Sequence, residues 1–306
     1  MHSFPRQMHD LARTAGIRGE IQQEVHREGF EGMLTNVGGY TAQQFEQTRT
    51  TNQEALPVII PAHNEGGPDS DLPATLLALA RTGEAYPIVV NNRSEDDTVA
   101  IANRMGAIVI DAPQGRKMAA TKEGIRFTRH ELRTDAMGFT DADTLIPKRL
   151  PGLMRQRLMQ TDQGQGALAL GGSIKYHGPS KLADITLSTT GHLANYRSLR
   201  RGTMPTPHGH NFALQFDGEG KMQAGIEALP DDLFVEQNGP ADDLLIARKM
   251  AEVGAAVSGT LNLDEYVLTR GDRVTSIGSV VKLLLHRTNY DELVWNSYQS
   301  EYNDLQ

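Results

Sequence analysis

Short apolar segments alternate with helical patterns through the first half of the chain. Four of these segments show no regular alternation of polar and apolar side chains, which is typical of strands buried on both faces of a parallel sheet. They cover residues 56–60, 87–90, 107–110 and 136–140. Because strands that alternate with helices form βαβ units, the pattern predicts an α/β fold with a mixed, mostly parallel sheet flanked by helices.

Two of the predicted connecting helices have recognisable ends. Leucines at helical spacing over residues 72–80 follow the start signal Asp71-Leu72-Pro73. Residues 99–105 have the same spacing. We expect Ser94 and Asp97 to form a capping box in front of this second helix, and Gly106 to end it.

The rest of the chain has a different pattern. Strands are expected over residues 167–176, 211–216 and 255–263, and helices over 182–199, 241–253 and 277–293. Residues 1–55 are polar and poor in strand formers, which predicts a helical N-terminal extension with a helix near 18–27 and then a Gly/Thr/Gln-rich connection. This extension is either packed on the core or loosely tied to it. Residues 56–306 form one unit, because no repeat or linker-like stretch divides them.

Composition narrows the class of protein. A chain of 306 residues can bury a full core without disulfides, and its lack of cysteine excludes thiolate metal sites and cysteine nucleophiles. Zero cysteine fits a reducing compartment, and the N-terminus has no apolar signal-peptide core, so we expect a cytoplasmic protein. No apolar run approaches the length of about 18 residues that a membrane span requires. The net charge of −8 argues against a dedicated nucleic-acid binder.

Polar side chains follow the first two predicted strands. The first strand runs into Pro61-Ala62-His63-Asn64-Glu65-Gly66-Gly67, where neither a dinucleotide-binding glycine motif nor a P-loop is present. An ordinary polar turn explains this segment equally well. The second strand runs into Asn91 and Asn92, whose side-chain amides could pair with the edge of a nucleobase.

The fourth predicted strand is followed by Asp141-Ala142-Asp143. Two carboxylates at the end of a buried strand could converge with a diphosphate on Mg²⁺ or Mn²⁺. A second match to the same spacing, at Asp69 and Asp71, lies in a turn before a helix and reads as a helix cap. Position in the fold, and not the spacing itself, therefore distinguishes the two.

Two further clusters of charge remain open to two interpretations. Arg116 and Lys117 open a predicted helix, where they either bind an anion or form a solvated basic face. Asp242 and Asp243 open another helix, with Arg248 nearly two turns later, and acidic residues at a helix start are common for dipole reasons alone. His208 and His210 have a spacing that could hold a metal, but no acidic side chain is adjacent in the sequence.

Taken together and in order, five segments resemble the nucleotide-sugar-binding region of a GT-A glycosyltransferase, closest to glycosyltransferase family 2. These segments are VIIPAHNE, VVNNRSEDDT, GRKMAATKEG, FTDADT and ADDLLIAR. The resemblance implies the GT-A fold, with residues 56–150 binding the nucleotide sugar and residues 151–306 binding the acceptor.

The same resemblance implies roles for individual residues. The donor site would be formed by Pro61, Ala62, Asn64, Glu65, Asn91, Asn92, Arg116, Lys117 and Asp141. A divalent Mn²⁺ or Mg²⁺ would lie on Asp143 with help from Asp141. Asp242 would take the proton from the acceptor hydroxyl, and the sugar would transfer with inversion.

This sequence departs from the family pattern at the second strand tip and at the acceptor helix. Asn91 and Asn92 stand where the family has acidic residues, and Ala241 stands where it has a glutamate. An amide oxygen accepts a hydrogen bond from the imide of uracil or guanine, so a UDP-sugar is favoured and a GDP-sugar is possible. The acceptor is not readable, and a modified nucleic acid stays among the possibilities.

Three other functions remain as alternatives. A retaining enzyme resembling glucosyl-3-phosphoglycerate synthase would use a late histidine, for which His286, His208 and His210 are the candidates. A sugar nucleotidyltransferase would need a glycine-rich loop after the first strand, and none is present. A non-catalytic nucleotide-binding protein would have no need of Asp141, Asp143 and Asp242.

Overall fold

The structure is a computed structural model. It describes residues 4–67, 69–160, 166–170, 174–177, 211–229, 246, 249–250, 252–259 and 267–270. The helices are α1 (Phe4–Met33), the π-helix η1 (Leu34–Gly38), α2 (Gly39–Thr51), α3 (Leu72–Ala80), α4 (Thr98–Arg104), α5 (Lys117–His130), α6 (Leu150–Met159) and α8 (Lys221–Glu227). The strands are β1 (Leu56–Ala62), β2 (Ala85–Asn91), β3 (Ile108–Asp111), β4 (Ala136–Phe139), β5 (Ala167–Leu170), β6 (Ile174–His177), β7 (Phe212–Gln215), β8 (Ala256–Gly259) and β9 (Val267–Arg270).

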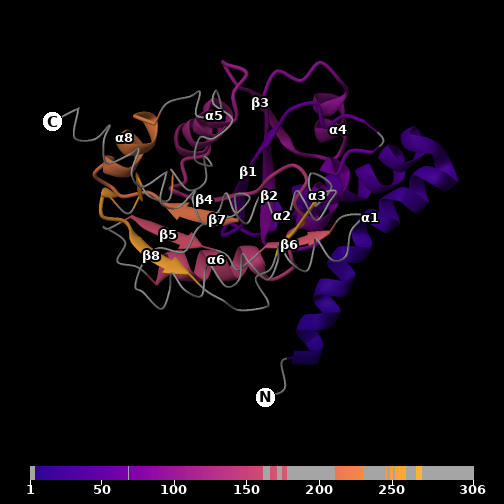
Figure 1. Cartoon of the computed structure of the whole chain (residues 1–306), viewed down its shortest axis with the longest axis horizontal. Coiled ribbons are helices and arrows are strands. Elements are labelled where there is room, and N and C mark those ends of the chain that lie inside the picture. Colours follow the sequence, from indigo (N-terminus) through magenta and orange to yellow (C-terminus); the bar gives the residue numbers. More distant parts are fainter. Residues whose placement is uncertain are drawn as a thin grey trace, which may run out of the picture.

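One mixed sheet organises the fold (Figure 1). Its strand order is β3-β2-β1-β4-β7-β5-β8, and β7 is antiparallel to both of its neighbours. A second sheet pairs β6 with β9 in parallel. The chain leaves β1 toward β2 and β3 and later returns to the opposite side of β1 as β4. The gap between β1 and β4 is therefore a topological switch point, and open α/β sheets bind ligands at the carboxyl ends of strands beside such a point.

The sheet is buried on both faces, as the predicted apolar strands require. Val58 and Ile60 of β1 belong to one core cluster, and Ile59 between them belongs to another. The first cluster also contains side chains from α1, α2, α3, α4 and α6, whereas the second contains side chains from α5 and α8. Alternate residues of β1 therefore face opposite sides of the sheet, and helices cover each side. This confirms the predicted α/β architecture with helices on both faces.

The N-terminal extension contributes to the core. Ile17, Ile21 and Phe45 are nearly inaccessible to solvent and lie in the same cluster as Val58 and Ile60 of β1. Of the two arrangements left open by the sequence, packing on the core is therefore the one observed. The predicted Gly/Thr/Gln-rich connection is wrong, because residues 34–51 are helical as η1 and α2.

Two other local predictions are wrong. The single long strand expected over residues 167–176 is two strands, β5 and β6, which belong to different sheets. The expected capping box also does not form, because α4 begins only at Thr98 and the Ser94 hydroxyl accepts a hydrogen bond from the Asn64 amide instead. Gly106 does follow α4, in the left-handed conformation that favours glycine (φ 81°).

The remaining strand and helix positions hold wherever the structure describes them, but Asp71 precedes α3 without a side-chain capping bond, and its carboxylate pairs with Arg18. The first four strands and the strands near residues 211–216 and 255–263 are present, and Ile246, Lys249 and Met250 are helical. The helices expected over residues 182–199 and 277–293 lie outside the described residues. Among the described residues, no helix combines the length and apolar character that crossing a bilayer demands.

Helix α5 lies unusually close to the sheet at Gly124. A Cβ atom at this position would lie 2.5 Å from Cγ2 of Ile59 and 3.1 Å from Cγ2 of Val90. Both contacts are to branched side chains inside a core cluster, which cannot move aside at low cost. The absence of a side chain at Gly124 therefore sets the distance between α5 and strands β1 and β2.

We expect Gly124→Ala to destabilise the protein by about 1–3 kcal/mol, because the added methyl overpacks this contact. Gly16→Ala is the matched control, since a Cβ there meets nothing within 4 Å. Helix propensity alone should make that control more stable by about 0.5–1 kcal/mol. Urea unfolding of both variants measures the difference, and equal effects would contradict the close approach of α5.

A candidate nucleotide-binding site at the strand tips

The loop after β1 is joined to the loop after β2 by hydrogen bonds. His63 Nδ1 lies 2.8 Å from the main-chain carbonyl oxygen of Asn92. Because a carbonyl oxygen can only accept a hydrogen bond, the Nδ1 nitrogen carries the hydrogen and donates it. The backbone N–H of Asn64 donates to Ser94 Oγ, and the backbone N–H of Glu95 donates to the side-chain oxygen Oδ1 of Asn64. The two strand tips therefore form one connected surface.

Asp96 and Thr98 hold the same loop from the start of α4. The Gly66 amide donates to Asp96 Oδ2 over 2.7 Å, and the Glu65 amide donates to Thr98 Oγ1 over 2.7 Å. Partial burial alone would raise the pKa of Asp96, but hydrogen bonds from the Thr98 hydroxyl and from the Gly66 and Thr98 amides outweigh it and lower the pKa. A Cβ on Gly66 would lie 2.3 Å from the Thr98 nitrogen, so the close approach requires glycine.

Both strand tips contain a backbone conformation that is costly for residues other than glycine. Asn64 has φ 55° and Arg93 has φ 56°, which is the left-handed region. Such positions persist when the surrounding structure imposes them, and they gather at ligand sites. The hydrogen bonds that involve Asn64 and its neighbours are consistent with this explanation.

The two asparagines after β2 differ in their surroundings. The Asn91 side chain is occupied on both sides, since Nδ2 donates to Asp111 Oδ1 over 2.7 Å and Oδ1 accepts from the Ser94 amide over 2.9 Å. Asn92 is only 9% exposed, and its Oδ1 has no hydrogen-bond partner in the described part of the chain. A buried acceptor without a partner normally costs free energy, so Asn92 is the stronger candidate for contacting a ligand.

Pro61 and Ala62, also expected at the donor site, are buried within β1. The Ala62 carbonyl accepts a hydrogen bond from the Asn92 amide over 2.8 Å, and its side chain belongs to a core cluster. Pro61 and Ala62 therefore belong to the buried strand, and Ala62 helps to position Asn92 through its carbonyl group. Glu65 is partly exposed and accepts a hydrogen bond from the Ser70 hydroxyl.

The two candidate metal ligands lie in a tight turn directly after β4. Residues Asp141 to Thr144 form this turn, in which the Thr144 amide donates to the Asp141 carbonyl over 3.2 Å. Ala142, between the two acids, is 5% exposed and packs in the core. The buried alanine anchors the turn, while Asp141 and Asp143 are both partly exposed.

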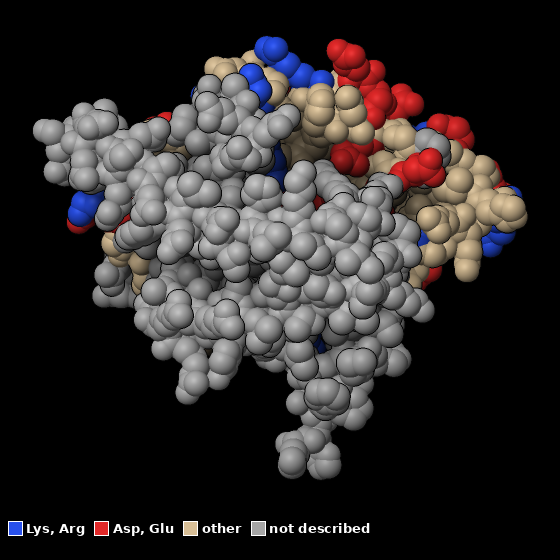
Figure 2. All heavy atoms as spheres, viewed as in Figure 1, with Lys and Arg blue, Asp and Glu red and all other residues tan. Residues whose placement is uncertain are grey.

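Basic side chains approach this turn from the start of α5. Lys117 Nζ lies 2.7 Å from Asp141 Oδ1, and both side chains are partly exposed. Arg116 precedes the helix and is exposed. Figure 2 shows acidic and basic side chains gathered along the upper edge of the view, acidic toward α4 and basic toward α5.

The structure thus brings together nearly all of the site residues expected from the first half of the sequence. The tips of β1, β2 and β4 are neighbours in the sheet, and the start of α5 reaches the β4 turn through Lys117. No group of three or more metal-ligating side chains occurs among the described residues. Asp242, Asp243, Arg248, His208, His210 and His286 lie outside the described residues.

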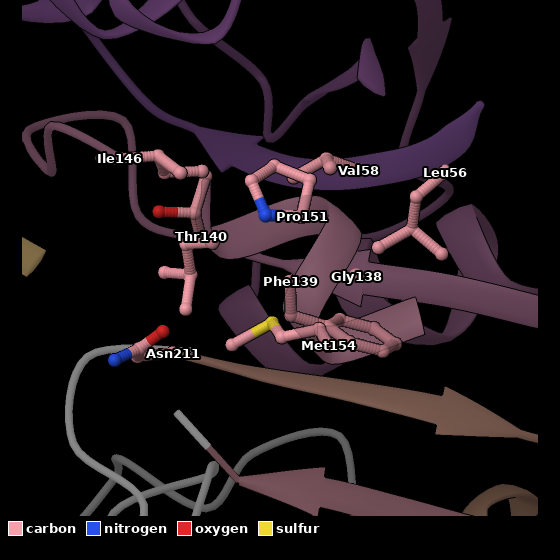
Figure 3. A pocket seen from close by; sticks show the side chains of 10 residues that line it. Leu56, Val58, Gly138, Phe139, Thr140, Ile146, Pro151, Met154 and Asn211 are labelled. Carbon is pink, nitrogen blue, oxygen red and sulfur yellow. The ribbon is translucent and has the colours of Figure 1, made fainter. Parts of the chain in front are cut away.

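A small pocket lies elsewhere, between β1, β4 and α6 (Figure 3). Its lining is mostly apolar and includes Leu56, Phe139 and Met154, together with Thr140 and Asn211. Thr140 is 1% exposed and its hydroxyl oxygen has no partner among the described residues. The pocket lies against the core, next to the turn of Asp141 to Thr144 (the acidic turn). Its apolar lining makes it unsuited to a large polar ligand.

Sequence reasoning missed three side chains that hold the site in place. Asp96 and Thr98 lie within the second quoted motif, so a signal for them was present, but their role as partners of the β1 loop depends on the fold. Arg18 donates to the Asp143 carbonyl across 125 positions of sequence. No local pattern could have indicated that contact.

The family model described as glycosyl transferase family 2 matches residues 58–217, more than half of the chain. No curated protein matches the sequence. Among solved structures, the chain is similar to S. aureus TarS residues 1–349, with 15% identity, a TM-score of 0.44, and coverage of 71% of this chain and 60% of that one. The chain thus spans less than two thirds of that TarS fragment.

Two further solved structures are similar at the same level of identity. Glucosyl-3-phosphoglycerate synthase from Mycobacterium tuberculosis, in complex with Mn²⁺ and UDP-glucose, is 15% identical with a TM-score of 0.44 and 82% coverage of both chains. The mannosyltransferase PcManGT from Pyrobaculum calidifontis, in complex with GDP-Man and Mn²⁺, is 15% identical with a TM-score of 0.47, covering 85% of this chain and 70% of that one.

Proposed function

The chain belongs to glycosyltransferase family 2, and on this basis we propose that it transfers a sugar from a nucleoside diphosphate sugar to an acceptor hydroxyl, with inversion and with a divalent metal ion. Its sheet and flanking helices form the GT-A fold expected from the sequence. The observation that carries the proposal is the Asp141–Thr144 turn, because it places two carboxylates at the carboxyl end of β4, beside the topological switch point.

The nucleoside would bind over the joined tips of β1 and β2. Asn92 has a buried oxygen acceptor without a partner among the described residues, and an imide N–H of uracil or guanine is a donor of the right kind. Binding the base would relieve the cost of that unmatched acceptor. This supports a UDP-sugar as donor, with a GDP-sugar as the second possibility. Asn91 would act indirectly, because its side chain already holds Ser94 and Asp111.

The side chains at the β4 turn suit a divalent cation that shares its ligands with the donor. Mg²⁺ and Mn²⁺ often use only one or two carboxylates from the protein and complete their shell with water and substrate phosphates. Asp143 is the principal ligand in this proposal, with Asp141 beside it; an oxygen of Asp141 also pairs with Lys117, and an oxygen of Asp143 accepts from the Thr144 hydroxyl. A divalent ion held there would supply positive charge to the leaving diphosphate.

Residues of the chain itself would bind and orient the diphosphate. Lys117 lies at the first turn of α5 and within 2.7 Å of Asp141, so its ammonium is near the proposed cation site. The backbone N–H groups at the start of α5 attract anions, and Arg116 adds an exposed positive charge there. Together these groups would hold the leaving group while the acceptor attacks.

Asp242 is the proposed general base. The acceptor hydroxyl oxygen would form a bond to the anomeric carbon as the bond from that carbon to the diphosphate breaks, and the hydroxyl proton would pass to Asp242. Assistance of this kind contributes roughly 10²–10⁴-fold to the rate. Attack from the face opposite the leaving group inverts the configuration of the sugar.

We expect Asp143→Ala to abolish the increase in melting temperature that a UDP-sugar with Mn²⁺ produces in the unaltered protein. Ligand binding stabilises the folded state in proportion to RT ln(1 + [L]/Kd), so loss of the cation ligand removes the effect. Asp69→Ala is the control, because its carboxylate has the same Asp-x-Asp spacing but precedes α3 instead of following a strand. Thermal unfolding measures both, and an unchanged ligand-induced increase in Asp143→Ala would contradict the metal assignment.

We expect Asn92→Ala to weaken UDP binding by about 1–3 kcal/mol, the cost of leaving a buried polar group of the ligand without its partner. The exposed Asn103 of α4 offers a control, since Asn103→Ala removes the same amide far from the strand tips. Calorimetric titration with UDP and Mn²⁺ gives both affinities. If Asn92→Ala binds UDP as tightly as Asn103→Ala does, the base lies elsewhere.

We expect Asp242→Asn to keep donor affinity but to lower turnover by roughly 10²-fold or more, because the amide cannot accept the proton. Hydrolysis of the donor, with water in place of the acceptor, measures turnover, and NMR of the released sugar shows its configuration. Asp243→Asn is the neighbouring control. A larger loss of turnover in Asp243→Asn than in Asp242→Asn would refute Asp242 as the base. Release of the sugar with retained configuration would refute it as well.

A further inference from the structure

Arg18 of α1 joins the N-terminal extension to the acidic turn, which is formed by Asp141 to Thr144. Arg18 donates from Nη2 to the carbonyl oxygen of Asp143 over 2.8 Å, and from Nε to Asp71 Oδ1 over 2.8 Å. The Arg18 and Asp71 side chains are 15% and 11% exposed. A planar guanidinium can serve both acceptors at once with fixed geometry, which an ammonium cannot do.

The two preceding carbonyls of the turn are also held. The Asp141 carbonyl accepts from the Thr144 amide, and the Ala142 carbonyl accepts from the buried Thr75 hydroxyl of α3 over 2.8 Å. Thr75 and Asp71 are one helical turn apart, since the Thr75 amide donates to the Asp71 carbonyl. The start of α3 therefore contacts the turn directly through Thr75 and indirectly through Asp71 and Arg18.

These contacts restrict the directions that the two carboxylates can take. Three consecutive peptide carbonyls of the turn each have a donor, and two of these donors come from other elements of the fold. The orientation of a side chain depends on the backbone from which it branches, so a held peptide group restricts where the Asp143 carboxylate can lie. Asp71 balances the charge of Arg18, so the guanidinium adds little net positive charge beside a cation site.

We infer that Arg18 is a positioning residue: it links α1 and α3 to the Asp143 carbonyl and so sets the affinity of the acidic turn for a divalent cation and a nucleoside diphosphate. The identity of the ligand in this inference rests on the proposed function, whereas the contacts of Arg18 do not depend on it. It makes the N-terminal extension part of the donor site, although no residue of the extension need touch the donor.

The test compares Arg18→Ala with Glu20→Gln. Glu20 also joins α1 to α3, through Arg81 at distances of 3.1 and 2.5 Å, but it has no contact with the acidic turn in the described structure. The two variants therefore loosen the same helix pair and differ in whether the turn is affected. Arg18→Lys retains the charge but supplies a single donor group in place of the fork.

The first measurement needs no ligand. We expect hydrogen exchange of the Thr144 amide to be about tenfold faster in Arg18→Ala than in the unaltered protein or in Glu20→Gln, because loss of a charge-assisted hydrogen bond has that order of effect. Arg18→Lys should fall between them. Exchange in Arg18→Ala that equals exchange in Glu20→Gln would overturn the inference, whatever the protein does with nucleotides.

The second measurement uses calorimetry with Mn²⁺ and UDP. We expect Arg18→Ala to raise the Kd for Mn²⁺ in the presence of UDP by about tenfold, with Glu20→Gln unchanged and Arg18→Lys intermediate. In donor hydrolysis, the KM for Mn²⁺ should rise while kcat changes by less than about threefold. A purely structural role would lower the melting temperature and leave the Mn²⁺ affinity of the folded protein unchanged, which would overturn the inference.

Removing Arg18 leaves a buried carboxylate at Asp71 and could prevent folding. The double variant Arg18→Met with Asp71→Asn removes both charges, and the same exchange and affinity changes are expected from it. If the unaltered protein itself fails to bind UDP with Mn²⁺, the proposed function is wrong. The exchange experiment still decides whether Arg18 holds the turn.

Discussion

The candidate site depends on one constraint, which is that the peptide groups at the tips of β1, β2 and β4 must find hydrogen-bond partners beyond the sheet. Ladder bonding ends where the strands end, and unpaired peptide groups near a buried core are costly. Here the partners are side chains from other elements: Thr98 and Asp96 for the β1 loop, and Thr75 and Arg18 for the β4 turn. Satisfying the backbone in this way also fixes the direction of the polar side chains that the loops carry.

The burial of the sheet explains why the candidate site lies at this edge. Both faces are covered by helices and contribute to two apolar clusters, so polar side chains can be placed only where strands end. The switch between β1 and β4 lies at the carboxyl ends of these strands, which is where open α/β sheets bind ligands. Helix α5 packs closely on β1 and β2 at Gly124, and Lys117 in its first turn pairs with Asp141.

Predictions made from the sequence succeeded where a local pattern is sufficient and failed where partners are distant. The apolar runs located the first four strands to within about two residues at each end, which is the usual uncertainty of such boundaries. The pattern over residues 167–176 could not reveal that β5 and β6 separate into different sheets, because sheet membership depends on pairing with β7, β8 and β9. Ser94 was wrongly assigned as a helix cap, since its hydroxyl bonds to Asn64 on another loop.

The sequence by itself determined which residues stand at the ends of strands, and hence that Asn92, Asp141 and Asp143 share one edge of a parallel sheet. It could do so because burial imposes a period on neighbouring residues, and strand direction follows from the βαβ order. Only the tertiary structure decided how those residues are used. The Asn91 side chain is occupied by Asp111, whereas the buried Asn92 oxygen has no partner in the described part of the chain, and Arg18 reaches the Asp143 carbonyl from 125 positions away. The Asn91–Asp111 contact depends on the pairing of β2 with β3, and the Arg18 contact depends on how α1 packs over the sheet. Both are set by the whole core and not by any local pattern.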